Sequence, residues 1–353
     1  MSKAAICVVV PVYKAMATLD RCVESVLAQQ VEGGLTCILV DDGSPDESGA
    51  LCDAWAAKDD RVTVIHQDDL GVSGARNSGL AAADSEFIVF LDSDDALRPG
   101  ALQAALTAQR ATPQDFVVWH YTTDEKDPAA VTADAELRTQ AGLARLWLDC
   151  LLAMPWNKLY RADLAKQLQF DVQYTLGEDL QFVLDYIALL GQTVPEFGYR
   201  VMTSPLTFYD CSRGGTLSTR YHANYCDIWP KHFAKLNAAC HAAACPAEDM
   251  RPLHRAELQV FAEGVADIMR RDPSPTQRLK GYKAEAALRS PWLRALLERM
   301  KIEHCYSAYY LPCRWHNVGL VCRVDEARRA NAPLYGKLDW AGYYLLLGRM
   351  RRD

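Results

Sequence analysis

Short apolar runs alternate with amphipathic segments over the first 120 residues of the chain. Runs rich in β-branched and aromatic residues predict strands at 4–12, 36–40, 61–67, 86–91 and 116–121. Helical spacing or helix-start residues lie between these runs and predict helices at 19–27, from 45, at 73–83 and from 99. Such alternation with short connections predicts an α/β fold, in which helices cover both faces of a doubly wound, mostly parallel sheet.

Helix-start residues fix two of these boundaries, and the pattern changes further along the chain. Thr18 is expected to cap the first helix, and Ser44 with Pro45 to open the second. Residues 122–140 are polar and predict a loop, whereas residues 194–209 predict two strands. After this point the segments are helical and rich in Ala, Leu and Arg. We therefore expect a catalytic domain at 1–213 and a mainly helical region at 214–353.

Charged side chains follow three consecutive strands of the predicted sheet. Asp41 and Asp42 end the second strand, Arg76 comes after the third, and Asp92-Ser93-Asp94-Asp95 follows the fourth. In open parallel sheets, ligands bind beyond the carboxyl ends of the strands. These residues are therefore expected to lie at one edge and to contact one ligand.

The Asp92-x-Asp94-Asp95 triplet is the sharpest of these features. Adjacent carboxylates repel one another unless water, a cation or a basic side chain compensates their charge. Oxygen ligands of this kind suit Mg²⁺ or Mn²⁺, which complete their shells with substrate phosphates. Taken alone, a solvated turn before a helix explains the triplet equally well.

Other motifs keep a structural alternative beside the functional one. A carboxylate of the Asp41-Asp42 pair could accept a hydrogen bond from a base or a ribose, whereas Gly43 and Ser44 only need a turn. The Glu178-Asp179 pair opens a helix, where the dipole favours acids in any case. The glycines of 71–79 do not have the spacing of a dinucleotide-binding loop, and Gly79 is expected to allow close helix packing.

Composition and charge narrow the class of protein. The 353 residues have an ordinary globular composition and a net charge of −7, which disfavours nucleic-acid binding. The 12 cysteines show no zinc-binding spacing, no run approaches the length of a membrane span, and nothing resembles a signal peptide. We therefore expect reduced thiols and a cytoplasmic protein.

From residue 281 onward the chain carries 13 Lys and Arg against 7 Asp and Glu, with aromatic residues among them. Cations with aromatic side chains suit a membrane interface, so peripheral attachment to the inner face of the cell membrane is one hypothesis. The alternative is that these aromatic residues pack a helical subdomain: Trp292, Tyr306, Tyr309, Tyr310, Trp315, Trp340, Tyr343 and Tyr344.

Taken in order, the motifs resemble those of family 2 glycosyltransferases of the GT-A fold, especially bacterial enzymes of surface-polysaccharide synthesis. The resemblance covers about residues 4–213 and rests on Val10–Tyr13, Asp41–Ser44, Gly71–Gly79, Asp92–Asp95, Trp156–Tyr160 and Glu178–Asp179. Lys14 departs from the pattern, because many relatives carry Asn at that position. The helical region after residue 213 contains no motif that we can place.

The resemblance implies a role for each matching position. Pro11, Tyr13, Asp41 and Asp42 would line the nucleotide pocket, with Arg76 over the nucleotide. Asp92 would hold the ribose or donor sugar. Asp94 would bind Mn²⁺ or Mg²⁺, and Asp95 would support that site or contact the donor sugar. Trp156 and Lys158 would shape the sugar and acceptor pockets. Asp179 would be the catalytic base, with Glu178 beside it.

The implied activity is that of an inverting, metal-dependent hexosyltransferase. It would move a sugar from a nucleotide-sugar, UDP-linked by family frequency, to a hydroxyl of a saccharide or lipid-linked saccharide. The main alternative is a non-catalytic scaffold that binds a nucleotide-sugar within a polysaccharide assembly complex. A nucleotidyltransferase would need a Gly-rich basic loop after the first strand, which residues 12–16 lack.

Overall fold

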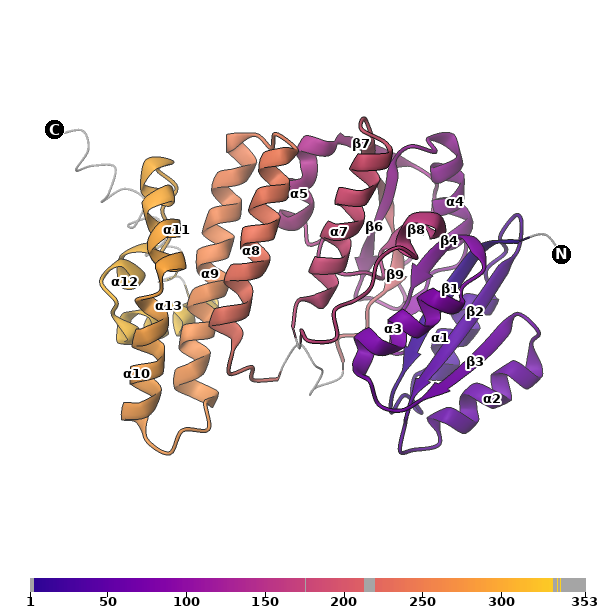
Figure 1. Ribbon diagram of the computed structural model, residues 1–353, viewed down its shortest axis with the longest axis horizontal. Helices are drawn as coiled ribbons and strands as arrows, with labels where there is room; N and C mark the ends of the chain where they lie inside the picture. The colour runs from indigo at the N-terminus through magenta and orange to yellow at the C-terminus, as the bar shows by residue number, and fades with distance from the viewer. Residues whose placement is uncertain (1–2, 175, 213–219, 333–334, 336, 338–353) are drawn as a thin grey trace. The chain divides into compact units, whose positions relative to one another are not determined.

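The structure is a computed structural model that describes residues 3–174, 176–212, 220–332, 335 and 337 (Figure 1). The chain divides into two compact units, Met1–Gly214 and Gly215–Asp353. The first unit holds all the strands among the described residues, and the second consists of helices.

The first unit is built on a nine-stranded sheet with the order β3-β2-β1-β4-β8-β6-β9-β5, and β7 pairs with β9. The strands are β1 (Ala4–Val12), β2 (Leu35–Asp42), β3 (Val62–Gln67), β4 (Ser85–Phe90), β5 (Ala96–Leu97), β6 (Phe116–Thr122), β7 (Ala135–Thr139), β8 (Lys158–Arg161) and β9 (Gly198–Phe208). Strands β3, β2, β1 and β4 are parallel, as the sequence predicts. The antiparallel strand β8 then joins β4 to β6.

Helices cover both faces of this sheet (Figure 1). They are α1 (Leu19–Leu27), α2 (Ser48–Lys58), α3 (Gly71–Ala82), α4 (Ala101–Ala111), α5 (Leu143–Leu148), α6 (Ala162–Ala165) and α7 (Glu178–Thr193). Alternate residues of β1 face opposite sides, so Ile6, Val8 and Val10 pack in the core that α1, α2 and α4 share. Val9 faces α3, where a Cβ on Gly79 would lie 2.3 Å from its Cγ1. This close approach confirms the packing role expected for Gly79.

The predicted start of the second helix is wrong. Helix α2 begins at Ser48, and no side chain caps it. The Ser44 hydroxyl instead accepts a hydrogen bond from the Lys14 backbone N–H at 3.3 Å, while the Ser44 N–H donates to Asp41 at 3.2 Å. Ser44 thus links the ends of β1 and β2, and this use of its hydroxyl competes with helix capping. Thr18 does precede α1, although its hydroxyl donates to the Ala15 carbonyl.

Two predictions for the second half of this unit also need correction. The segment expected to be a loop at 122–140 contains strand β7, which pairs with β9 along five residues. The two strands expected at 194–209 are one continuous strand, β9. Its pairing with β6 is irregular near Trp119 and His120, so a register shift replaces the break that the sequence suggests.

The second unit contains α8 (Tyr225–Ala242), α9 (Ala247–Arg271), α10 (Gln277–Leu288), α11 (Pro291–Ile302), α12 (Tyr310–Arg314) and α13 (Val318–Arg329). The long helix α9 contacts α8, α10, α11 and α13 and forms the centre of the unit. Ser290 and Asn317 cap α11 and α13 by accepting a hydrogen bond from a backbone N–H of the first turn. No helix among the described residues is long and apolar enough to cross a membrane.

Most aromatic residues that the structure describes in the basic C-terminal region lie in the core of this unit or pack against it. Tyr306, Tyr309 and Tyr310 are buried, and Trp292 is a partly buried residue whose ring packs against Phe261 of the same core. Packing in the core makes these rings unavailable to a membrane surface. This favours the expectation that they pack a helical subdomain over the expectation that they contact a membrane. Trp315 differs, because it is 62% exposed. Trp340, Tyr343 and Tyr344 lie outside the described residues.

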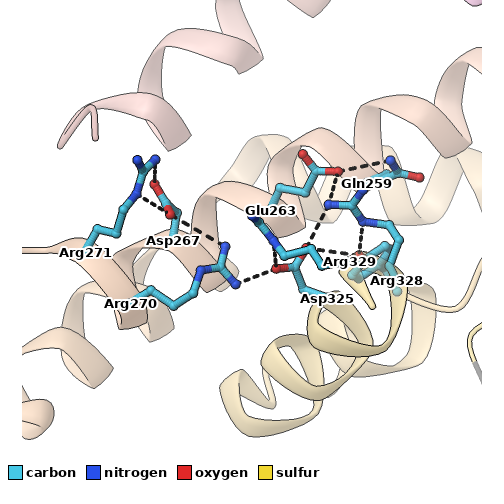
Figure 2. A network of polar contacts seen from close by, with 9 residues as sticks. Gln259, Glu263, Asp267, Arg270, Arg271, Asp325, Arg328 and Arg329 are labelled. Carbon is cyan, nitrogen blue, oxygen red and sulfur yellow. Dashed lines mark hydrogen bonds and ion pairs between the residues drawn. The ribbon is translucent and has the colours of Figure 1, made fainter. Parts of the chain in front are cut away.

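A buried aspartate connects α13 to α9 (Figure 2). Asp325 has no exposed side-chain surface, and it forms ion pairs with Arg270 at 2.5 Å, Arg329 at 2.8 Å and Arg328 at 3.1 Å. Arg328 also pairs with Glu263 of α9 at 2.8 Å. A carboxylate that is buried with several charge-assisted hydrogen bonds is compensated for its lost hydration.

We predict that Asp325→Asn lowers the free energy of unfolding of the chain by about 1–3 kcal/mol, because it removes charge-assisted hydrogen bonds to three arginines. The loss stays within this range because the arginine side chains are 26–53% exposed and regain water. Urea unfolding followed by circular dichroism measures the change. Glu298→Gln is the control, because its pair with Arg314 is exposed and screened by solvent, so its loss should matter less than that of the buried Asp325 pairs. Equal losses in the two variants would contradict the prediction.

Candidate active site

The acidic turn after β4 contains a buried carboxyl group without a complete set of partners. The Asp95 N–H donates to the Asp92 carbonyl at 3.0 Å and closes the turn. The Asp95 side chain is fully buried, and its Oδ1 accepts a hydrogen bond from the Asp210 N–H at 2.9 Å. Its Oδ2 has no hydrogen-bond partner among the described residues. Burial raises the pKa of Asp95 to about 9, and the carboxylates of Asp92 and Asp94 add to the effect.

These properties fit a divalent cation. A buried oxygen without a partner next to two further carboxylates lacks the positive charge that would compensate it. Carboxylate oxygens are the ligands that Mn²⁺ and Mg²⁺ accept. The turn Asp92–Asp95 therefore has the donor set expected for the metal site, with Asp94 as the predicted ligand.

Arg76 joins the acidic turn to the first turn of α7. Its guanidinium donates to Asp92 at 2.8 Å and to Asp179 at 2.6 Å. The Arg76 side chain is only 3% exposed, whereas the two carboxylates keep 28% and 29% of their surface. Three sequence-predicted site residues that are up to 103 positions apart are thus in direct contact.

The residues around Arg76 explain why it is held there. The Asn77 side chain donates to the Phe170 carbonyl at 2.8 Å and accepts from the Phe170 N–H at 2.7 Å. The Arg76 guanidinium lies over the Phe170 ring at 5.3 Å, and that ring stacks on Phe182 of α7 at 4.0 Å. Asn77 and Phe170 were not among the predicted site residues, although Asn77 directly follows Arg76 in the sequence.

Asp179 lies in the first turn of α7, after Gly177 in the left-handed conformation (φ 78°). Burial raises the pKa of Asp179 above its ordinary value, and the Arg76 guanidinium opposes this rise. Because the carboxylate is 29% exposed and 2.6 Å from a guanidinium, the ionised form remains accessible near neutral pH. Glu178 precedes it as the first residue of the helix.

Asp41 and Asp42 occupy the end of β2, where the register places Asp41 beside Val12 of β1. Asp42 accepts hydrogen bonds from the Gln67 amide at 2.7 Å and from the Leu70 N–H at 3.0 Å. Asp41 contacts His66 at 3.0 Å. Burial acts to raise the pKa of Asp41, but hydrogen bonds from Ser44 and His66 outweigh it and hold the pKa below its ordinary value.

The end of β1 lies between the two acidic segments, because β1 pairs with both β2 and β4. Pro11 is buried within β1, and Tyr13, the first residue after the strand, is 44% exposed. The Lys14 ammonium lies 5.0 Å from the Tyr13 ring centroid. Tyr13 therefore offers an accessible aromatic side chain at the same edge of the sheet as the carboxylates.

Trp156 and Lys158 are both buried, but their surroundings differ. The Trp156 ring stacks on the Tyr209 ring, with 5.4 Å between their centroids. Tyr209 directly precedes Asp210, whose backbone N–H donates to Asp95. The Lys158 ammonium donates to the carbonyls of Leu151 at 2.7 Å and Met154 at 2.5 Å, which lie in the loop that precedes β8. Burial lowers the pKa of Lys158 well below its ordinary value. The structure thus places Lys158 as a support of the loop that carries Trp156.

Sequence reasoning missed Arg21 and Asp210. The Arg21 guanidinium donates to the Asp94 carbonyl at 2.5 Å and to the Asp210 carboxylate at 2.7 Å. Hydrogen bonds from Ser212 and Arg21 lower the pKa of Asp210 to about 2. Arg21 lies 73 residues from Asp94 and 189 from Asp210, so no local spacing signals these contacts.

Comparison with known families gives the same assignment as these residues. Residues 7–169 match the model of glycosyl transferase family 2. This segment of the chain is therefore similar to a family 2 glycosyltransferase domain. The matched range contains the strands β1, β2, β3 and β4 with the acidic turn, and Trp156 and Lys158 near its end.

Curated relatives of this domain are glycosyltransferases and polysaccharide biosynthesis proteins. Glycosyltransferase GlyG of Streptococcus pneumoniae is 39% identical over 124 residues, 35% of this chain and 41% of that protein. Succinoglycan biosynthesis protein ExoO of Rhizobium meliloti is 32% identical over 213 residues, 54% of this chain and 58% of that protein. The chain thus spans less than two thirds of the length of either relative.

Comparison with solved structures shows the fold of the chain. The chain matches S. aureus TarS in complex with UDP-GlcNAc with a TM-score of 0.60, 17% identity, 93% of this chain and 92% of that chain covered. It matches the UDP complex of the same protein with a TM-score of 0.56, 17% identity and the same coverage. The predicted GT-A-type α/β fold with a C-terminal helical region is thereby confirmed.

Proposed function

We propose that this chain transfers a sugar from a nucleotide-sugar to a hydroxyl of a saccharide or lipid-linked saccharide, with inversion at the anomeric carbon. The nucleotide of the proposed donor is UDP. The observation that carries the proposal is the double contact of Arg76 with Asp92 and Asp179. It brings the acidic turn, which would face the donor diphosphate, next to a carboxylate that suits a general base.

The donor would lie along the edge of the sheet formed by the ends of β2, β1 and β4. Pro11, Tyr13, Asp41 and Asp42 would contact the nucleotide, and Asp92 and Asp95 the ribose or donor sugar. Asp94, supported by the rest of the turn, would hold Mn²⁺ or Mg²⁺. The bound cation would supply Lewis-acid stabilisation of the charge that develops on the nucleoside diphosphate.

Asp179 would take the proton of the acceptor hydroxyl as its oxygen bonds to the anomeric carbon and the bond to the diphosphate breaks. Carboxylates perform this role when they reach the hydroxyl in ionised form. Arg76 favours the ionised form of Asp179 against the effect of burial, and its hydrogen bond holds the carboxylate in place. Glu178 adds negative charge beside it, and Trp156 would form a wall of the sugar pocket.

A screen of donors measures the proposed activity most directly. We expect release of UDP from at least one UDP-sugar when a saccharide acceptor is present, and loss of release when EDTA removes Mn²⁺ or Mg²⁺. The scaffold alternative predicts binding of the nucleotide-sugar with no acceptor-dependent release. GDP-sugars are tested in parallel, and release from these alone would contradict the choice of UDP.

Asp179→Asn tests the base. We expect the turnover rate to fall by about 10²–10⁴, the usual worth of general base catalysis, because the amide has no capacity to take the proton. Affinity for UDP should change little, since the substitution preserves shape and lies outside the proposed nucleotide contacts. Isothermal titration with UDP and a turnover assay separate the two effects. Unchanged turnover would remove Asp179 from this role.

The pH dependence supplies the control for this variant. Because the base acts when deprotonated, turnover of the unaltered chain should fall as the pH drops through the pKa of Asp179. Burial raises that pKa to about 7 even though the Arg76 guanidinium opposes the rise, so we expect the fall near this pH. The residual activity of Asp179→Asn should lack this fall, whereas Glu178→Gln should retain it.

Attachment to the inner face of the cell membrane belongs to the same proposal, as a route to lipid-linked acceptors. The basic C-terminal region and the 62% exposed Trp315 support it, although the buried tyrosines do not contribute. Flotation with anionic vesicles at low salt measures attachment. We expect cofloating protein that high salt releases; protein that stays at the bottom at low salt would end the membrane hypothesis.

A further inference from the structure

Helix α1 holds the backbone of the acidic turn and of the segment that follows it. Three side chains of α1 and that of Gln29, two residues after the helix ends, make these contacts. The bonds are Arg21 to the Asp94 carbonyl at 2.5 Å, Cys22 to the Asp92 carbonyl at 3.6 Å, Ser25 to the Leu97 N–H at 2.9 Å and Gln29 to the Arg98 carbonyl at 3.0 Å. The turn is therefore held from outside its own strand.

Arg21 differs from the other three because it also reaches a second segment of the chain. The same Nη2 atom that donates to the Asp94 carbonyl donates to the Asp210 carboxylate at 2.7 Å. The guanidinium lies over the ring of Phe208, the last residue of β9, at 5.0 Å. Arg21 thereby ties the acidic turn to the residues that follow β9.

Asp210 passes this connection on to Asp95. Its backbone N–H donates to Asp95 Oδ1 at 2.9 Å. Its own carboxylate is 8% exposed and is held by the Ser212 N–H and hydroxyl at 2.9 and 2.6 Å, opposite Arg21. One guanidinium therefore fixes the backbone of Asp94 directly and the carboxyl of Asp95 through a single intermediate.

We infer that Arg21 is a positioning residue for the divalent cation: together with Asp210 it sets the direction of the Asp94 and Asp95 carboxylates toward the ion and the donor diphosphate. This inference rests on the proposed function. Outer partners that orient ligands typically contribute about 10–100-fold in metal affinity. Arg21 is 30% exposed, and its polar partners among the described residues are Asp94, Asp210 and Glu125, none of which is a proposed nucleotide contact.

The chemistry of the guanidinium explains the choice of arginine at this position. Its planar fork offers several N–H donors in fixed directions, whereas the lysine ammonium is a flexible point charge. The positive charge also offsets the mutual repulsion of the carboxylates in the turn. Lysine at position 21 would keep the charge and lose the fixed geometry, so it separates the two contributions.

The test measures binding of Mn²⁺ in the presence of UDP, followed by the electron paramagnetic resonance signal of free Mn²⁺. We expect Arg21→Ala to weaken Mn²⁺ binding by about 10-fold or more, and Arg21→Lys to lie between it and the unaltered chain. Arg61→Ala is the matched control, because Arg61 is a partly exposed arginine paired with one aspartate, Asp59, in the same unit. It should change the affinity by less than about twofold.

Two further variants keep the inference falsifiable if Arg21→Ala folds poorly, which thermal unfolding detects. Asp210→Asn should weaken Mn²⁺ binding in the same direction, and Arg21→Lys/Asp210→Asn should lose no more than the larger single effect, since both act through one link. Mn²⁺ affinity unchanged in Arg21→Lys, Arg21→Ala and Asp210→Asn would overturn the inference alone. No Mn²⁺ binding by the unaltered chain would overturn both the inference and the proposed cation site.

Discussion

The buried guanidinium of Arg76 sets the condition that the rest of the site meets. A charge that is only 3% exposed has lost its water and needs fixed carboxylates in its place. Asp92 and Asp179 supply them, so the side chain of Arg76 bridges the turn after β4 and the start of α7. The Asn77–Phe170 hydrogen bonds and the close packing of Gly79 on β1 hold α3 in the position from which Arg76 reaches both carboxylates.

The acidic turn has the opposite problem, because negative charge exceeds the positive charge around it. Arg76 offsets part of the negative charge of the turn through Asp92, and Arg21 offsets the charge of the neighbouring Asp210. Asp95 still has a buried oxygen without a hydrogen-bond partner among the described residues. A divalent cation resolves this imbalance, and the diphosphate of a nucleotide-sugar completes its coordination. The first unit thus holds a site that two arginines shape from different helices.

The sequence predicted the parts of this arrangement that depend on strand ends. Asp41, Asp42 and the turn at Asp92–Asp95 lie at one edge because four parallel strands end there, and apolar runs reveal such strands. The link from Arg21 to Asp210 was beyond prediction, because it joins residues 189 positions apart across a strand, β9, whose pairing is irregular. The side chains of Ser44 and Lys158 satisfy nearby backbone groups, and residue type alone does not reveal this use.

A crystal structure of the chain with UDP and Mn²⁺, recorded near the manganese absorption edge, tests the central claim most directly. The account predicts one anomalous peak at coordination distance from Asp94, with the diphosphate on its other side and Asp179 facing the space where a donor sugar would continue. A peak outside the turn Asp92–Asp95, or UDP bound away from the ends of β1 and β2, would contradict it.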